Sequence, residues 1–333
     1  MNRAKAVCTL IACLFVVAFV LHSSDQGAEI GISAFSASGH GRTGVYLTSH
    51  AVGKASVWRE LLAARERGLI DAVVINVKNM HGEITYDSAV PLARTIGSSI
   101  DRLQPAALLR ELRSRGFYLI ARQVLFYDPL LAKHLGHDES WVPAHDETAI
   151  AYNLAIAEEV AGLGFDEIQF DYVRYADGGA LEPIYADRYA AVTRFLSEAE
   201  ALLSGRIAIS ADLFGRVMWG WNEKRIDPIG QSLEAVSQHV DFISPMLYPS
   251  HYVEQAYRDD PYRTIRDGLT SGNARVDACF RPYLQAFDRF IPPSMSLETY
   301  ISEQVEAAVA CGADGMLFWH PACEYDALYR ALD

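Results

Sequence analysis

The sequence has little basic charge. Its 333 residues include 29 Lys and Arg against 42 Asp and Glu, which gives a formal net charge of −13. Binding to the phosphates of nucleic acid requires a basic face, so we exclude nucleic acid as a partner. The negative excess also disfavours anionic lipid and acidic polymers, and it favours neutral or cationic ligands.

Cysteine is scarce as well. Cys8 and Cys13 lie in an apolar N-terminal run, and only Cys279, Cys311 and Cys323 follow it. Three is an odd number, and a chain of this length builds a core without disulfides, so we expect buried free thiols. The sequence has no C-x-x-C pair, no clustered Cys/His spacing and no compact acidic ligand set, which predicts neither a metal site nor a cofactor.

The N-terminus has the pattern of an export signal. Arg3 and Lys5 precede the unbroken apolar run 6–21, and a polar stretch follows it. The run is shorter than the roughly 20 residues that span a bilayer, which favours a cleaved signal over a permanent anchor. We therefore expect a signal sequence over 1–28, a Gly- and Ser-rich linker over 29–42, and a periplasmic or secreted protein that contacts membrane only if the signal stays uncleaved.

The rest of the chain alternates short apolar runs with amphipathic stretches. Helical spacing recurs at 149–163, 185–203 and 297–310, between strand-like runs. Eight strand and helix units over residues 43–333 predict a single (β/α)8 barrel. The alternative is an open doubly wound sheet, but no G-x-G-x-x-G turn follows the first strand and no phosphate-binding loop occurs. The expected strands are 44–48, 72–78, 117–124, 167–171, 207–212, 242–246, 278–281 and 315–319.

Two aspartates end neighbouring strands of this predicted barrel. In the fourth strand Glu167, Gln169 and Asp171 alternate with apolar residues, so they face the barrel interior. Asp212 ends the fifth strand in the same way. Active sites of such barrels lie at the carboxyl ends of the strands, and paired carboxylates suit glycoside hydrolysis. We predict that Asp171 and Asp212 are catalytic; their structural alternatives are an ion pair of Asp171 with Arg174 or Lys78, and a loop cap formed by Asp212.

Cationic and aromatic side chains accompany the two aspartates. Cations hold a carboxylate ionised, and flat rings offer apolar faces to sugars. Each of these residues has an alternative as part of the barrel scaffold or of the cover over the core, and Lys78 has a further alternative as a Schiff-base amine in a lyase or aldolase. The predicted substrate-binding residues are Lys78, Arg122, Arg174, Tyr248, Arg281, Trp319 and Trp219.

Three stretches of sequence resemble a bacterial glycosyl hydrolase family that was first described as a domain of unknown function. They are Phe165–Tyr175, Ser210–Gly215 and Asp241–Tyr252, and the resemblance extends over nearly all of 43–319. It implies a TIM barrel related to the glycosidase superfamily. In the wider alpha-amylase clan the nucleophile is an Asp that ends strand four, which Asp171 matches.

The fifth strand departs from that clan's pattern. The clan has a glutamate as the acid at the end of strand five, where this sequence has the shorter Asp212. Glu83, Glu223 and Glu324, on loops after strands two, five and eight, are reserve candidates for the acid. We expect hydrolysis of a glycosidic bond in a polysaccharide or cell-envelope glycan. The alternative is a catalytically impaired glycan-binding barrel that serves as an envelope recognition module.

Overall fold

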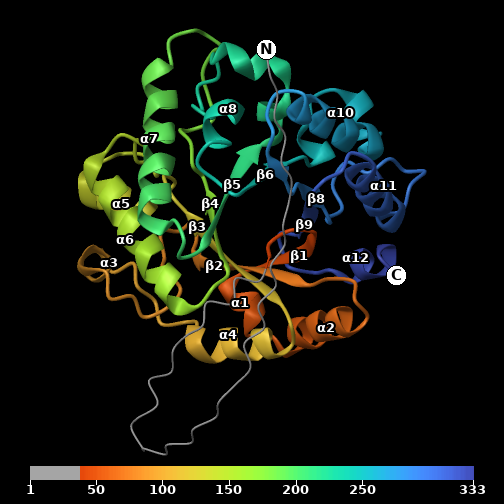
Figure 1. Cartoon of the computed structure of the whole chain (residues 1–333), viewed down its shortest axis with the longest axis horizontal. Coiled ribbons are helices and arrows are strands. Elements are labelled where there is room, and N and C mark those ends of the chain that lie inside the picture. Colours follow the sequence, from red (N-terminus) through yellow and green to blue (C-terminus); the bar gives the residue numbers. More distant parts are fainter. Residues whose placement is uncertain (1–37) are drawn as a thin grey trace, which may run out of the picture. The chain divides into compact units, whose positions relative to one another are not determined.

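A computed structural model describes residues 38–333, and its centre is a closed barrel of parallel strands (Figure 1). The strands run in the order β5-β4-β3-β2-β1-β9-β8-β6, and the pairing of β5 with β6 closes the ring. This confirms the predicted (β/α)8 barrel. The strands are β1 Arg42–Leu47, β2 Ala72–Lys78, β3 Tyr118–Val124, β4 Glu167–Asp171, β5 Ala208–Phe214, β6 Phe242–Met246, β7 Cys279–Phe280, β8 Tyr283–Gln285 and β9 Gly315–Trp319.

The seventh position of the barrel is occupied by two short strands instead of the single strand expected at 278–281. β7 pairs only with β6, whereas β8 pairs with both β6 and β9. Pro282 lies between them and has no N–H to donate, which interrupts the ladder. The strand continues beyond the predicted end, and this places Tyr283 inside the barrel, where its hydroxyl donates to Gln169 Oε1 at 2.8 Å.

Helices surround the strands (Figure 1). The three helices predicted from apolar spacing correspond to α6, α7 and α11, and side-chain caps fix two of their starts: Asp146 for α6 and Ser296 for α11. Among residues 38–333, no helix is long and apolar enough to cross a membrane. The helices are α1 Ser49–Val52, α2 Ala55–Glu66, α3 Pro91–Ile96, α4 Pro105–Ser114, α5 Pro129–Leu135, α6 Glu147–Leu163, α7 Ala186–Leu203, α8 Leu233–Val236, α9 Gln255–Arg258, α10 Pro261–Asn273, α11 Leu297–Ala310 and α12 Asp326–Ala331.

The fourth strand shows how the sequence divides the barrel into an outer core and a polar interior. Phe170 points outward and packs against Phe195 of α7, with ring centroids 5.5 Å apart. Glu167, Gln169 and Asp171 point inward, as their alternation predicts. The apolar core therefore lies between strands and helices, and the barrel axis carries hydrogen-bonding side chains.

Several predictions concern the N-terminus and the cysteines. The expected signal at 1–28 and most of the expected linker at 29–42 lie outside the described residues, and β1 begins at Arg42. Cys279, Cys311 and Cys323 are free thiols, as their odd number predicted, and only Cys323 is fully buried.

Candidate active site

A pocket of about 300 Å³ opens at the carboxyl ends of the barrel strands. Its volume is at the lower end of the range for small-molecule sites. Both predicted catalytic aspartates line it, from β4 and β5. The lining residues are Arg122, Asp171, Tyr172, Arg174, Asp212, Phe214, Met246, Tyr248, His251, Tyr283 and Trp319.

Asp171, at the end of β4, is held by a cation and by the backbone. Arg122 Nε donates to Asp171 Oδ2 at 2.9 Å, and Arg122 Nη2 donates to the same oxygen. The Tyr172 N–H donates to Asp171 Oδ1 at 2.6 Å. Tyr172 has φ 52°, a left-handed conformation that is rare for residues other than glycine and recurs at functional sites. The partner of Asp171 is thus Arg122, and neither Arg174 nor Lys78.

Arg122 is itself oriented by two polar side chains from neighbouring strands. Its Nη1 donates to Asn76 Oδ1 at 2.6 Å, and Asn76 Nδ2 donates to Tyr46 Oη at 2.6 Å. Burial is the largest single effect and opposes the charge of Arg122, but the surrounding groups, with Asp171 first, together outweigh it and raise the pKa of the guanidinium. A fixed cation therefore stands beside Asp171, supported by β1 and β2.

Asp212, on β5, is almost fully buried and lacks such support. Its Oδ1 has no hydrogen-bond partner among the described residues 38–333, and its Oδ2 lies 4.0 Å from Arg122 Nε. Burial raises the pKa of the Asp212 carboxyl well above its usual range, and the charge of Asp171 raises it further against the opposing effect of Arg122. Both effects favour the neutral form of the Asp212 carboxyl, which lines the pocket.

The two carboxyl groups are close enough to act on one bond. Arg122 Nε lies 2.9 Å from Asp171 Oδ2 and 4.0 Å from Asp212 Oδ2, so these oxygens are separated by at most about 7 Å. Retaining glycosidases hold their pair about 5 to 5.5 Å apart and inverting ones about 6.5 to 9.5 Å. A separation of at most about 7 Å is compatible with either class of enzyme.

Aromatic rings form the opposite wall of the pocket. Trp319 lies with its ring centroid 5.8 Å from that of Tyr248 and 5.2 Å from that of Phe287. Burial, followed by the charges of Asp212 and Asp171, raises the pKa of Tyr248 well above its usual range, so its hydroxyl stays neutral. Arg174 packs its guanidinium 4.2 Å from the ring centroid of Phe214. Trp319, Tyr248 and Arg174 were predicted to bind substrate, and all three line the pocket.

Lys78 does not reach the pocket, which corrects the prediction that it faces the same way as Asn76. The register between β2 and β3 shifts between Asn76 and Lys78, and this bulge turns Lys78 out of the barrel. Its ammonium lies 2.8 Å from Asp128 Oδ2 and donates to Val124 O at 2.8 Å, fully buried. A buried, paired ammonium offers no access to a carbonyl substrate, which also removes the Schiff-base alternative.

Arg281 lies at the other end of the barrel, so its predicted role in substrate binding is wrong. It is fully buried and pairs with Glu167, at the start of β4. Its guanidinium also packs 4.5 Å from the ring centroid of Phe242, at the start of β6. Arg281 therefore stabilises the base of the barrel interior.

Trp219 and the reserve glutamates also fall outside the pocket. Trp219 packs against Tyr252 and Tyr257, with ring centroids 6.1 and 5.4 Å away. Within the described residues 38–333, none of Glu83, Glu223 and Glu324 lines the pocket. Because no glutamate is present there, Asp212 is the candidate acid.

Sequence reasoning missed part of this site. Tyr283 was missed because the strand was ended before Pro282, although the alternation continues through Tyr283 and Gln285. Asn76 and Tyr46 support Arg122 from within β2 and β1, where a polar side chain in an apolar strand was the available signal. Phe214, Met246 and His251 come from loops or strand ends with no distinguishing pattern.

One group of metal-ligand side chains occurs in the described part of the chain. His40, Cys279 and Asp314 place their ligand atoms within 4.8 Å of one another. They lie where β1, β7 and β9 begin, at the end of the barrel opposite to the pocket. This group has no contact with the two catalytic candidates.

Solved structures share this fold at low sequence identity. The PgaB (BpsB) glycoside hydrolase domain from Bordetella bronchiseptica aligns with a TM-score of 0.64 and 15% identity, covering 88% of this chain and 98% of that one. A chitinase from Chromobacterium violaceum aligns at 0.54 and 14%, covering 87% and 98%. The endo-1,4-beta-mannanase from Rhizomucor miehei aligns at 0.58 and 10%, covering 84% and 86%.

Sequence comparison gives the family. No curated protein sequence matches the chain. A family described as "Putative glycosyl hydrolase domain" matches residues 44–325, which include both aspartates and every strand of the barrel except the first two residues of β1. The protein therefore belongs to this family of glycosyl hydrolase domains.

Proposed function

We propose that the protein hydrolyses a glycosidic bond in a polysaccharide or cell-envelope glycan. Asp212 is the general acid/base, and Asp171 is the nucleophile or the ionised stabiliser. The observation that carries this proposal is the buried carboxyl of Asp212, whose Oδ1 has no hydrogen-bond partner within residues 38–333, beside the Arg122-bound carboxylate of Asp171 in one pocket. Export by residues 1–28 is part of the proposal, since it would bring the enzyme to such glycans.

The proposed reaction uses the two groups in sequence. Asp212 gives its proton to the glycosidic oxygen as the bond to the anomeric carbon breaks. Asp171 bonds to, or stabilises, the positively charged anomeric carbon. Water then adds to that carbon and gives a proton back to Asp212; where Asp171 has formed a bond to the carbon, that bond breaks in this step and releases the Asp171 carboxylate. Arg122, Arg174 and Tyr248 orient the sugar, and the Trp319 ring packs against its face.

The test is a survey of glycans for released reducing ends. The names of two structural neighbours supply the first substrates, chitin and β-1,4-mannan, and bacterial cell-wall glycan is the third. We expect release by the wild type and loss of release in Asp171→Asn, with an unchanged circular dichroism spectrum. Undiminished release by Asp171→Asn would contradict the assignment.

A second candidate is a glycan-binding barrel without catalysis. It is favoured by the bonding of Asp171, because Arg122 occupies one carboxylate oxygen and the Tyr172 N–H occupies the other. Under this reading the protein retains oligosaccharides but releases no reducing ends. The same survey, run alongside a binding measurement, distinguishes the two functions.

A further inference from the structure

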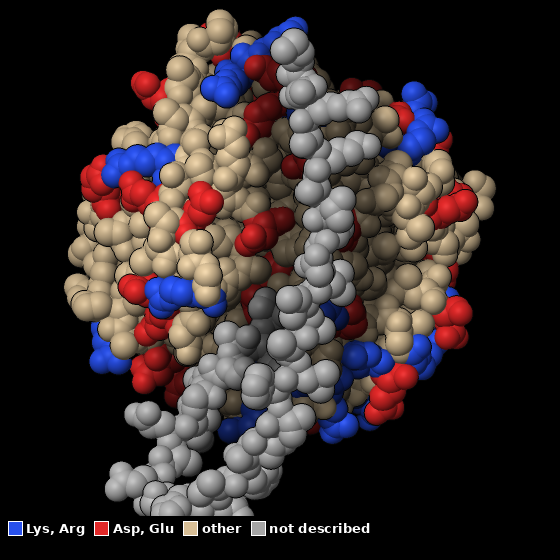
Figure 2. All heavy atoms as spheres, viewed as in Figure 1, with Lys and Arg blue, Asp and Glu red and all other residues tan. Residues whose placement is uncertain are grey.

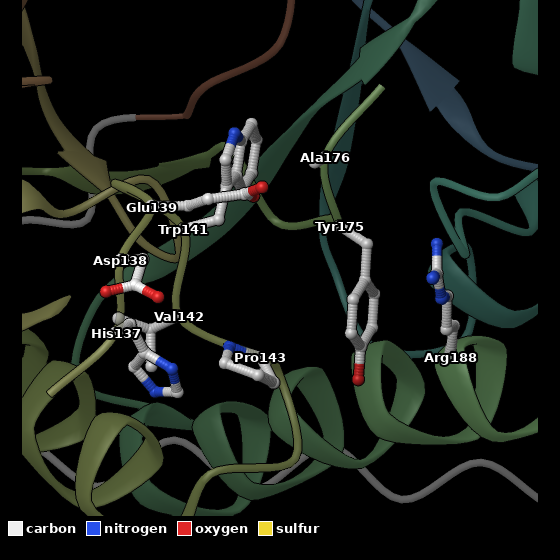
Figure 3. A pocket seen from close by; sticks show the side chains of 9 residues that line it. All are labelled: His137, Asp138, Glu139, Trp141, Val142, Pro143, Tyr175, Ala176 and Arg188. Carbon is white, nitrogen blue, oxygen red and sulfur yellow. The ribbon is translucent and has the colours of Figure 1, made fainter. Parts of the chain in front are cut away.

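A second pocket lies beside the mouth of the barrel (Figure 3). It has a volume of about 410 Å³, and we call it the outer pocket. Figure 3 shows the loop from His137 to Pro143 on one side and Tyr175 and Arg188 on the other. The lining residues are His137, Asp138, Glu139, Trp141, Val142, Pro143, Tyr175, Ala176 and Arg188.

The walls of the outer pocket are fixed by hydrogen bonds. The loop that carries Trp141 is held to the segment between β3 and α5, since Asp128 N donates to Ser140 O and Val142 N donates to Phe126 O, each at 2.8 Å. On the opposite wall, Arg188 Nη1 donates to Pro228 O at 2.7 Å. Such walls are already in position before a ligand arrives, which lowers the entropy cost of binding.

The outer pocket shares a wall with the barrel pocket. The guanidinium of Arg174 lies 4.6 Å from the ring centroid of Trp141 and 5.0 Å from that of Tyr172. Arg174 and Tyr172 line the barrel pocket, whereas Trp141 and the neighbouring Tyr175 line the outer one. A ligand longer than the barrel pocket can therefore cross this aromatic wall into the outer pocket.

We propose that the outer pocket binds a distal sugar unit of the oligosaccharide whose scissile bond lies between Asp171 and Asp212. This inference rests on the proposed function. The barrel pocket is at the small end of ligand sites, so a polymer must continue over its rim. The outer pocket offers there the ring of Trp141 for a sugar face, with carboxylates beside it for hydroxyl groups.

The charges of the outer pocket define the kind of sugar. Asp138 and Glu139 are exposed and make no ion pair with any residue in 38–333. The cation opposite, Arg188, is bound to Pro228 O and stacks on Tyr175 and Tyr185, with its guanidinium 5.0 and 4.8 Å from their ring centroids. Two exposed carboxylates therefore outnumber the one partly buried cation, and this negative balance favours a neutral or amine-bearing sugar over an acidic one.

The experiment measures dissociation constants by titration calorimetry on the full chain. The probes are disaccharides and hexasaccharides of N-acetylglucosamine, glucosamine, mannose and galacturonic acid. We expect the hexasaccharide of a neutral or amino sugar to bind the wild type more tightly than its disaccharide. Trp141→Ala and, by filling the pocket, Ala176→Trp should each weaken hexasaccharide binding about tenfold and leave disaccharide binding unchanged.

Two further variants complete the design. Glu139→Lys should reverse the ranking, so that the galacturonate hexasaccharide gains affinity and the glucosamine hexasaccharide loses it. Trp58→Ala is the matched control, because Trp58 is also half-buried and lines a separate hollow along α2, and it should change neither length dependence nor charge preference. If the wild type binds the disaccharide and the hexasaccharide equally tightly, the outer pocket does not bind a distal sugar, and the proposed function is unaffected. Failure of every oligosaccharide to bind overturns both.

Discussion

The barrel contains two pairs of arginine and carboxylate, one at its base and one at its mouth. At the base, Glu167 Oε1 accepts from Ser210 Oγ at 2.5 Å and from Arg281, and Oε2 accepts from Tyr118 Oη at 3.1 Å. At the mouth, Arg122 binds Asp171, but Oδ1 of the adjacent Asp212 has no hydrogen-bond partner in the part of the chain that the structure describes.

The difference lies in how completely the carboxyl groups are bonded. β4 supplies Glu167 and Asp171, and β5 supplies Ser210 and Asp212, so the same two strands build both ends. Where every carboxylate oxygen is bonded and solvent is excluded, the pair stabilises the barrel. Where one carboxyl is buried without a partner beside a pocket, its proton is available for transfer.

The largest expected effect is that of Asp212→Asn at the mouth. Removing a general acid costs about 10²- to 10⁴-fold in rate. We expect kcat for oligosaccharide hydrolysis to fall about 10³-fold. The fold should persist in circular dichroism, because Asn keeps the shape of the side chain. A variant that retains wild-type kcat would show that the acid lies elsewhere.

The matched change at the base is Glu167→Gln. It leaves Arg281 buried beside an uncharged partner, and breaking a buried pair costs about 3 to 5 kcal/mol. We expect the free energy of unfolding in urea to fall by about 3 kcal/mol while kcat of the folded protein stays near that of the wild type. A large loss of kcat with little loss of stability would place Glu167 in the chemistry and break the comparison.

The carboxyl group of Asp212 at the mouth should also affect how stability depends on pH. The folded-state pKa of Asp212 is raised, so the folded protein binds this proton more tightly than the unfolded chain, whose Asp pKa is about 3.9. The contribution of Asp212 to stability is therefore present below pH about 3.9 and is lost as pH rises through the raised folded-state pKa. As pH rises through this interval, the unfolding temperature should fall less in Asp212→Asn than in the wild type. Superimposable pH profiles of the two proteins would contradict the raised pKa.

A smaller effect is expected from the residues that orient Arg122. Asn76→Ala removes the acceptor for Arg122 Nη1 and the donor to Tyr46. We expect a loss of about 1 kcal/mol in stability and about a tenfold loss in kcat/KM. Tyr46→Phe keeps Asn76 in place and should lose less stability and less kcat/KM than Asn76→Ala. An equal or larger loss of either would show that Tyr46 acts independently of Asn76.

The smallest effects concern the two tryptophans that the sequence predicted to bind substrate. Trp319→Ala removes a ring from the pocket wall and should raise KM about fivefold, whereas Trp219→Ala should leave KM unchanged. Steady-state kinetics on one oligosaccharide measures both. A larger rise in KM for Trp219→Ala would mean that substrate extends toward α9 and α10.

Much of the fold was predictable because strand alternation and helix spacing are local patterns. β4 shows this best, since the alternation of Glu167, Gln169 and Asp171 determines which side chains enter the barrel. The position of Asp171 and Asp212 at the pocket followed from the fold, because parallel strands place their carboxyl ends together.

The remaining features depend on contacts that local pattern does not contain. The bulge after Asn76 reverses the direction in which the Lys78 side chain points, and no residue near it in the sequence indicates a bulge. Arg281 and Arg122 are both arginines in or next to an apolar strand, so the sequence does not distinguish them. Their ion-pair partners do: Arg281 pairs with Glu167 at the base of the barrel, and Arg122 pairs with Asp171 at the mouth. Figure 2 shows acidic and basic side chains interspersed over the described part of the face in view, so net charge alone did not locate the site.

The most direct test of the central claim is the titration of Asp212 itself. Carbon-13 NMR of aspartate-labelled protein follows each carboxyl group with pH, and comparison with Asp212→Asn assigns the signal. We predict that one aspartate titrates at a pH well above the usual range for aspartate side chains, and that its signal is missing from the variant. If every aspartate titrates at ordinary pH in both proteins, Asp212 is not held protonated at the mouth and the proposed acid is wrong.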